Sequence, residues 1–207
     1  MPDLGLFPLQ LVVFPGERLP LHIFEPRYLE LIAECRERDE EFGILLADEA
    51  DIHEVGTRAA VVEVLEQLPD GRLNIIVEGR ERFQVTRLTT GRSFRTAAVE
   101  PFLDEPDPAD PAAAANALRL LQALATAAGV EVDLPQPDSP TLSFEVAARV
   151  ELALDDEQEL LELRSERVRL DRLAELLAEA ADQTRLAREA HERAHTNGKL
   201  PHPPPLP

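Results

Sequence analysis

The stretch GTRAAVVEVLEQLPDGRLNIIVEGRERFQV, residues 56–85, decides the fold. Two runs rich in valine and isoleucine, 58–68 and 72–79, flank the tripeptide Pro69-Asp70-Gly71. Proline sets φ near the value that turns require, and glycine adopts positive φ without steric cost, so this tripeptide predicts a tight turn. The two runs are therefore expected to pair as an antiparallel hairpin.

Two more β-like segments follow, RERFQVTRL at 80–88 and RSFRTAAVEPF at 92–102. Several short strands with regular turns favour a small barrel or sandwich, and we expect these segments to be successive antiparallel strands. Within 80–88, Phe83 and Val85 alternate with Arg82 and other polar residues. We interpret the arginines mainly as a solvated face, with an anion site as the alternative.

The N-terminal segment up to residue 24 is apolar and is interrupted by Pro8, Pro15-Gly16 and Pro20. Because proline cannot donate to a sheet ladder, we expect two or three short strands with bends. A helix is predicted to begin at Pro26, a residue type suited to the first helical position. Its apolar residues recur at helical spacing, and the segment 41–48 after it reads as a buried strand. The predicted helical stripe consists of Tyr28, Leu31, Ile32 and Cys35.

The segment LDEPDPADP, 103–111, breaks both periodicities and divides the chain. We predict a β-rich part over 1–103, a helical bundle over 110–181, and an extended helix end with a proline-rich tail over 182–207. Helix starts are predicted at Asp110-Pro111, Ser139-Pro140, Asp155 and Ser165, with Gly129 ending the first helix. The last helix is expected to bury a stripe that fades beyond residue 181, formed by Val168, Leu173, Leu176, Leu177 and Ala180.

The segment HERAHTNGKLPH, 191–202, contains the HExxH pattern of zinc proteases. In those enzymes two histidines on one helix face bind zinc, and a third ligand and a water-excluding cleft complete the site. The pattern lies beyond the apolar stripe, and the position for a third histidine is Pro201, with His202 one residue late. We therefore interpret the pattern as a decoy and predict no metal site.

Other catalytic signatures are missing from the sequence. There is no phosphate-binding G-x-x-x-x-G-K-[ST] loop, and Lys199 in the tail is the only lysine, so a Ser-Lys dyad has no candidate. Cys35 is the only cysteine; it has no histidine near it in sequence and is interpreted as a packed thiol. We expect a protein that is not an enzyme and uses no cofactor.

The charge and hydropathy of the sequence limit the kinds of partner and the compartment that we expect. The net charge of −19 opposes long-range attraction to phosphates, which makes nucleic acid an unlikely partner. No apolar run approaches the roughly 20 residues that span a bilayer, the N-terminus lacks a secretory signal, and the single cysteine suits a reducing cytoplasm. One basic cluster departs from this acidity, formed by Arg72, Arg80, Arg82, Arg87, Arg92 and Arg95.

Three stretches resemble the N-terminal domain of Lon proteases, the LON substrate-binding domain. LFPLQLVVFPGERLPLHIFEPRYLEL, 6–31, resembles its opening signature. Residues 56–85 resemble its strand, Pro-Asp-Gly hairpin and Gly-x-x-Arg-Phe segment, and residues 142–177 resemble its helical part. The resemblance implies an α+β fold: a PUA-like β-pseudobarrel with one inserted helix, followed by a small α-helical bundle. It also implies a stand-alone LON-domain protein without the ATPase and protease domains.

The resemblance implies a non-enzymatic polypeptide-binding or adaptor protein, with a role in protein quality control. Its expected partners are unfolded or hydrophobic polypeptide segments, or a protein partner. An RNA-binding role for the PUA-like barrel and a small-molecule-binding role are the alternatives. Side chains of the 6–28 stretch are the candidate polypeptide-binding residues, although the same residues would also suit a core and its turns: Phe7, Leu9, Phe14, Pro15, His22, Phe24, Glu25, Arg27 and Tyr28.

Overall fold

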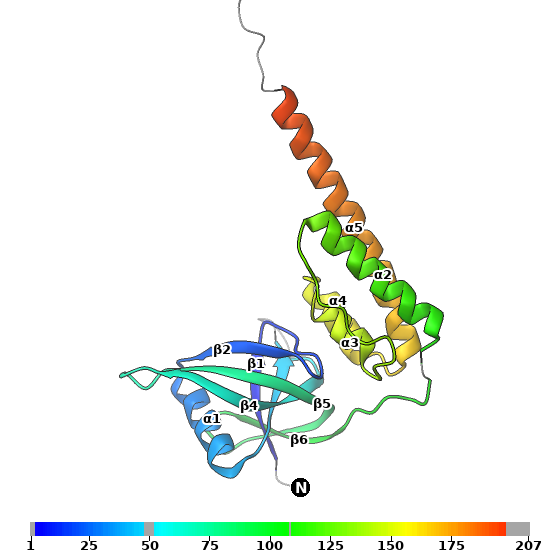
Figure 1. Cartoon of the computed structure of the whole chain (residues 1–207). Helices are drawn as coiled ribbons and strands as arrows, with labels where there is room; N and C mark the ends of the chain where they lie inside the picture. Colours follow the sequence, from blue (N-terminus) through cyan, green and yellow to red (C-terminus); the bar gives the residue numbers. More distant parts are fainter. Residues whose placement is uncertain (1–2, 48–51, 108, 198–207) are drawn as a thin grey trace, which may run out of the picture.

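A six-stranded sheet, closed into a ring, forms the N-terminal part of the computed structural model (Figure 1). The structure describes residues 3–47, 52–107 and 109–197, with side chains up to residue 188. Strand order is β2-β5-β4-β3-β1-β6, and pairing of β6 with β5 closes the ring. The strands are β1 (Leu4–Leu9), β2 (Arg18–Ile23), β3 (Phe42–Leu46), β4 (Val55–Gln67), β5 (Leu73–Thr89) and β6 (Arg95–Pro101).

The predicted hairpin of β4 and β5 is confirmed, but β5 is one strand of 17 residues rather than two. Its first half pairs with β2 and its second half with β6. Gly79 lies between the halves, where an added Cβ would stand 2.2 Å from the Phe14 carbonyl oxygen. Glycine is required here because the loop after β1 crosses the strand at this point. In the sequence alone, a glycine at this position suggests the end of one strand and the start of the next.

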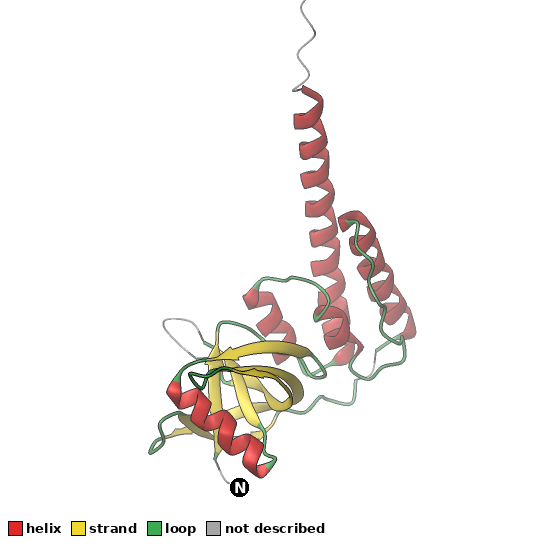
Figure 2. Cartoon of the chain, turned by 60° about the vertical axis from the view of Figure 1, so that its left-hand side comes forward, coloured by secondary structure: helices red, strands yellow, loops and turns green. Residues whose placement is uncertain are grey.

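Helix α1 (Pro26–Arg38) covers one side of the sheet (Figure 2). Its predicted apolar stripe is buried. Pro26 occupies its first turn as expected. The stripe packs on alternate residues of β2 and β5, among them Ile23 and Ile75. The outward-facing residues of these two strands are therefore left on the opposite side of the sheet.

Four helices follow the linker: α2 (Pro111–Ala128), α3 (Leu142–Ala147), α4 (Leu154–Glu162) and α5 (Glu166–Asn197). Three predicted helix ends are confirmed. The Ala112 amide donates to Asp110 Oδ1 over 3.1 Å, Gly129 ends α2 at φ 75°, and the Val168 amide donates to Ser165 Oγ over 3.1 Å. The predicted start of α4 is wrong, because the helix begins at Leu154 and places Asp155 in its first turn.

One residue of the predicted α5 stripe is misplaced. Val168 is exposed, whereas Arg169 and Leu170 are buried. At 100° per residue, Val168 stands about 200° around the helix from Leu170 and so faces solvent. The stripe fades as predicted beyond residue 181, where Thr184 is half-buried and the other described side chains, up to 188, are exposed.

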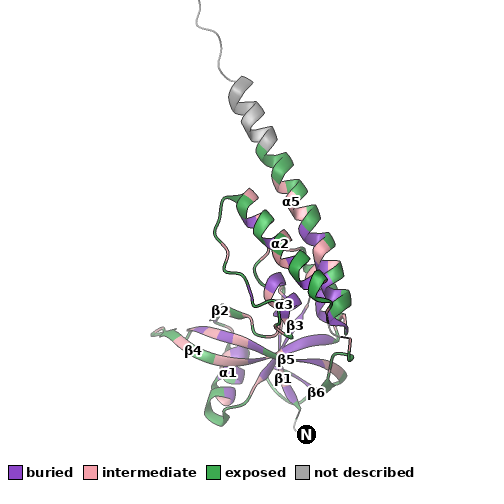
Figure 3. Ribbon diagram, turned by 45° about the vertical axis from the view of Figure 1, so that its right-hand side comes forward, coloured by how far each residue is buried: buried purple, intermediate pink, exposed green. Residues whose placement is uncertain are grey.

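The helices and the sheet share a hydrophobic core (Figure 3). Val12, Phe14 and Val55 from the sheet side join residues of all four C-terminal helices in this cluster. The rings of Phe14 and Phe144 stack with centroids 5.6 Å apart. The apolar stretch around Phe14 therefore serves to join the two parts of the chain.

Candidate polypeptide-binding surface

The nine candidate residues separate into buried and exposed groups. Phe7, Phe14 and Tyr28 are buried in the hydrophobic cores, which contradicts their assignment to a binding surface. Phe7 packs on Tyr28 with ring centroids 4.0 Å apart. Their aromatic area stabilises the fold instead, because each ring is already enclosed by neighbouring side chains. Leu9 and Pro15 are half-buried.

Phe24 is the one exposed ring among the three candidate phenylalanines. It lies between β2 and α1, and 60% of its surface is exposed. The His22 ring stacks beside it with centroids 5.9 Å apart. His22 Nδ1 lies 2.6 Å from Asn74 Oδ1, and Asn74 Nδ2 donates to Glu66 Oε2 over 3.0 Å. This row of polar contacts across β2, β5 and β4 fixes the imidazole, which in turn positions the aromatic ring.

Glu25 and Arg27, which follow Phe24 in the chain, form an ion pair. Arg27 Nη2 lies 2.6 Å from Glu25 Oε2, and the guanidinium lies 4.6 Å from the centroid of Tyr28. The two charged side chains therefore orient one another, and Glu25, the N-cap residue of α1, makes no side-chain cap bond. Both side chains are substantially exposed, so they border the surface rather than fill a core.

Leu65 adds to the exposed apolar area and was missed in the sequence. Its side chain is 52% exposed, and it lines a shallow hollow together with Pro20 and His22. Register shifts in β4 interrupt the alternation after Val61 and Val64. The signal was present in the adjacent apolar pairs 61–62 and 64–65, which a regular strand with one buried face does not produce. We call Pro20, His22, Phe24 and Leu65 the tip surface.

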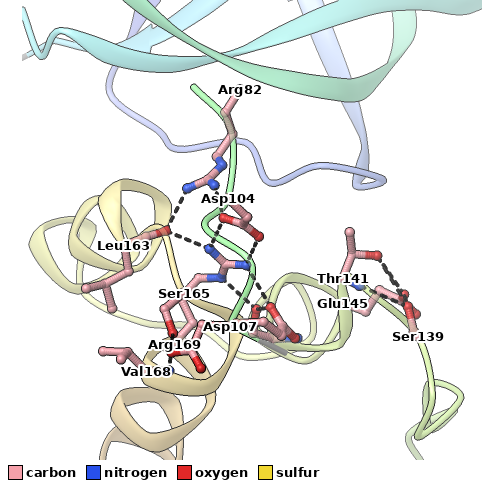
Figure 4. A network of polar contacts seen from close by, with 12 residues as sticks. Arg82, Asp104, Asp107, Ser139, Thr141, Glu145, Leu163, Ser165, Val168 and Arg169 are labelled. Atoms are coloured by element: carbon pink, nitrogen blue, oxygen red, sulfur yellow. Dashed lines mark hydrogen bonds and ion pairs between the residues drawn. The ribbon is translucent and has the colours of Figure 1, made fainter. Parts of the chain in front are cut away.

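The prediction that Arg82 lies on a solvated face is wrong, because its side chain is buried. Arg82 is 5% exposed and donates from Nη1 to the carbonyl oxygens of Leu161 and Leu163. It also forms an ion pair with Asp104, which in turn binds Arg169 of α5 (Figure 4). Burial comes first among the causes that lower the pKa of Arg82 to about 10, and it outweighs the attraction of Asp104. The residue joins the sheet to the helices.

Four of the six arginines in the basic cluster pair with acidic side chains, and Arg87 and Arg95 are exposed. Arg72 pairs with Asp70, Arg80 with Glu78, and Arg82 with Asp104. Arg92 pairs with Glu30 and Glu34 of α1. With four of its six charges paired, the cluster does not provide a continuous basic surface, so the geometry does not favour the RNA-binding alternative.

Metal-binding clusters and the single cysteine were the remaining candidates for chemistry. The described residues contain no group of three or more histidine, cysteine, aspartate or glutamate residues able to hold a metal ion. The side chains of His191 and His195 in the HExxH pattern lie outside the described ones. Cys35 is buried, and burial is the main cause that raises the pKa of its thiol to about 11. The interpretation of a packed thiol is confirmed, since little of it is thiolate at neutral pH.

The family model of the ATP-dependent protease La (LON) substrate-binding domain matches residues 3–179. The chain belongs to this family. It is 30% identical over 210 residues to the Lon protease of Paraburkholderia phytofirmans, covering 91% of this chain and 25% of that protease. It is 24% identical over 205 residues to the Lon protease of Cytophaga hutchinsonii, covering 90% of this chain and again 25% of the protease. The LON chain thus spans about a quarter of these curated relatives.

Two solved structures share the LON fold. The Lon N-terminal domain protein from Xanthomonas campestris is 25% identical, with a TM-score of 0.66 over 84% of this chain and 97% of that chain. The N-terminal domain of the Mycobacterium avium complex Lon protease is 16% identical, with a TM-score of 0.69 over 87% and 98%. The predicted α+β fold is confirmed. In addition, none of the helices within the described residues has the length and apolar character needed to cross a membrane.

Proposed function

We propose that this LON-family protein binds unfolded or hydrophobic polypeptide segments at the tip surface, without catalysing a reaction on them. The observation that carries the proposal is the position of Phe24, an aromatic side chain 60% exposed and fixed beside His22. An exposed aromatic ring that is already held in position offers a binding surface a large apolar contact.

The surroundings of Phe24 suit weak binding of many sequences. Leu65 and Pro20 extend the apolar area, Glu66 lines the same hollow, and the exposed Glu25–Arg27 ion pair follows Phe24 in the chain. An apolar centre with a polar rim is typical of protein interfaces. The name of the matching family, a substrate-binding domain, agrees with this role.

The proposal describes a recognition or adaptor protein of the cytoplasm that takes part in protein quality control. Two observations support this proposal. The matching family model is that of the substrate-binding domain of Lon. The packed Cys35 thiol suits a reducing compartment. Polypeptides are the proposed partners, and no cofactor enters the proposed activity.

The test is a fluorescence-anisotropy titration of the purified chain with a labelled, permanently unfolded polypeptide. Saturable binding in the micromolar range is expected. Phe24→Ser and Leu65→Ser should each weaken it about fivefold to tenfold, the effect of losing roughly 1–1.4 kcal/mol of apolar contact. Leu88→Ser is the matched control, since Leu88 of β5 is 53% exposed and lies outside the tip surface.

Two outcomes would contradict the proposal. Absence of binding at high protein concentration would show that the chain does not recognise unfolded segments. Equal weakening by Leu88→Ser and Phe24→Ser would place the contact elsewhere on the molecule. Circular dichroism and melting of each variant establish that the fold is retained.

A further inference from the structure

Strand β2 forms an edge of the sheet. Its described neighbour is β5, with which it pairs in a continuous antiparallel register from Arg18–Glu78 to Ile23–Leu73. Across its other edge, no strand within the described residues pairs with it. Arg18, Pro20 and His22 are exposed. An unpaired strand edge offers a row of backbone donors and acceptors to another chain.

The register determines which backbone groups are free. The Gly79 amide donates to the Glu17 carbonyl over 2.8 Å, so residue 17 faces β5. Residues of an antiparallel pair alternate between hydrogen-bonded and non-hydrogen-bonded positions. Leu19 and Leu21 therefore also bond to β5, whereas the backbones of Arg18 and His22 point to the open edge. Pro20, which has no amide hydrogen, occupies one of these outward positions, as proline on an edge strand does.

We propose that a bound polypeptide adds to β2 as a further strand, pairing with the backbones of Arg18, Pro20 and His22. This inference rests on the proposed function and specifies how the segment is held. Arg18 and His22 each offer an N–H and a C=O, and Pro20 offers a C=O. Hydrogen bonds to the main chain are independent of the side chains of the ligand, which a module that takes many unfolded sequences requires.

The position of the edge agrees with the tip surface. His22 belongs to both, because its backbone points to the open edge while its ring contacts Phe24 and Asn74. An added strand that pairs with His22 therefore ends beside the exposed Phe24 ring. Main-chain bonds supply affinity, and the apolar contact at the tip favours hydrophobic segments over polar ones.

Pro20 argues that the occupant is another polypeptide and not a second copy of the chain. Two β2 strands paired antiparallel about their centre would place Pro20 opposite Pro20, with two carbonyl groups and no donor between them. A polypeptide of different sequence supplies the missing N–H opposite the Pro20 carbonyl. Proline within an edge strand is one means by which proteins prevent pairing between identical edges.

The test compares two variants of one residue in the anisotropy titration with the unfolded polypeptide. His22→Ala removes the ring and keeps the outward amide, and His22→Pro removes both. Because this amide does not face β5, the proline should leave the sheet intact, which circular dichroism checks. Binding by His22→Pro is expected to be about fivefold to tenfold weaker than binding by His22→Ala, the effect of one main-chain hydrogen bond.

Amide hydrogen exchange on the unaltered protein gives a second measurement that needs no variant. The amides of Arg18 and His22 should exchange rapidly in the free protein and slowly when polypeptide saturates it, while Leu19 and Leu21 are protected in both states. Equal binding by the two His22 variants, or rapid exchange at Arg18 and His22 in the complex, would overturn strand addition alone. Absence of binding by the unaltered chain would overturn the proposed function as well.

Discussion

Arg82 of β5 and Arg169 of α5 donate to the same two acceptors. Both form ion pairs with the Asp104 carboxylate, and both donate to the Leu163 carbonyl, over 2.7 and 2.6 Å. Arg169 also pairs with the buried Glu166. Two like charges are held close together here only because carboxylates and carbonyl oxygens surround them (Figure 4). Beside the shared hydrophobic core, the ion pairs between the sheet and the helices therefore meet at Asp104, a linker residue.

Replacing Asp104 by asparagine should destabilise the protein more than a surface substitution does. The change leaves two buried guanidinium groups with one fewer counter-charge. We expect a loss of about 2–4 kcal/mol in the free energy of unfolding, below the upper range for buried pairs because Asp104 is 35% exposed. Urea denaturation measures this, with Glu105→Gln as the exposed control. A loss no larger than that of the control would contradict the role assigned to Asp104.

The same carboxylate predicts a loss of stability in acid. Burial tends to raise the pKa of Asp104, but the hydrogen bonds and charge of Arg169, with those of Arg82, lower it overall. A folded-state pKa below the unfolded value gives stability that is complete above the unfolded pKa, near 4, and declines as the pH falls toward the folded pKa. Melting temperatures from pH 6 to pH 2.5 should fall less steeply for Asp104→Asn than for the unaltered protein.

Glu157 of α4 should have the opposite dependence on pH. Burial first, and the charge of Glu17 second, raise its pKa to about 7. Because the pKa of Glu157 is higher in the folded than in the unfolded protein, the protonated carboxyl contributes stability. This contribution is complete below the unfolded pKa, near 4.5, and is lost as the pH rises through about 7. Glu157→Gln should therefore stabilise the protein at pH 8 by roughly 1 kcal/mol, after allowance for solvent screening, and change little at pH 4. Asp155→Asn on the same helix is the control, and equal shifts by both would refute the assignment.

Local signals in the sequence predicted the hairpin and several helix ends correctly, because the Pro69-Asp70-Gly71 turn and the Asp110 and Ser165 caps are formed by neighbouring residues. The burial of Arg82 could not be predicted from neighbouring residues. The alternation of Arg82 with Phe83 defines two faces of β5, but which face is covered depends on helices some 80 residues further along the chain. Leu65 was missed for a related reason, since β4 departs from regular alternation around it.

Replacing Pro20 by valine should strengthen pairing at the open edge of β2. Valine adds an outward N–H and has a higher strand propensity. We expect polypeptide binding at low protein concentration to tighten about threefold to tenfold. At high concentration a dimer that uses the same edge should form, because identical edges no longer lack donors. Sedimentation velocity detects the dimer, and Pro106→Val, at an exposed proline outside the sheet, is the control. A chain that stays monomeric with unchanged binding would refute the account of Pro20.

Deletion of residues 182–207 should leave the folded part almost as stable as before. Within 182–188, Thr184 is half-buried and donates to the Ala180 carbonyl of α5 itself, and Arg188 reaches a neighbouring helix by donating to the Ala127 carbonyl. We expect the melting temperature to fall by less than about 3 °C, equivalent to roughly 1 kcal/mol for a domain of this size. Deletion after Leu170 is the control and should unfold the bundle, because it removes the buried Leu173 and Leu177. A fall of ten degrees or more for the shorter deletion would show that the end of α5 packs against the bundle after all.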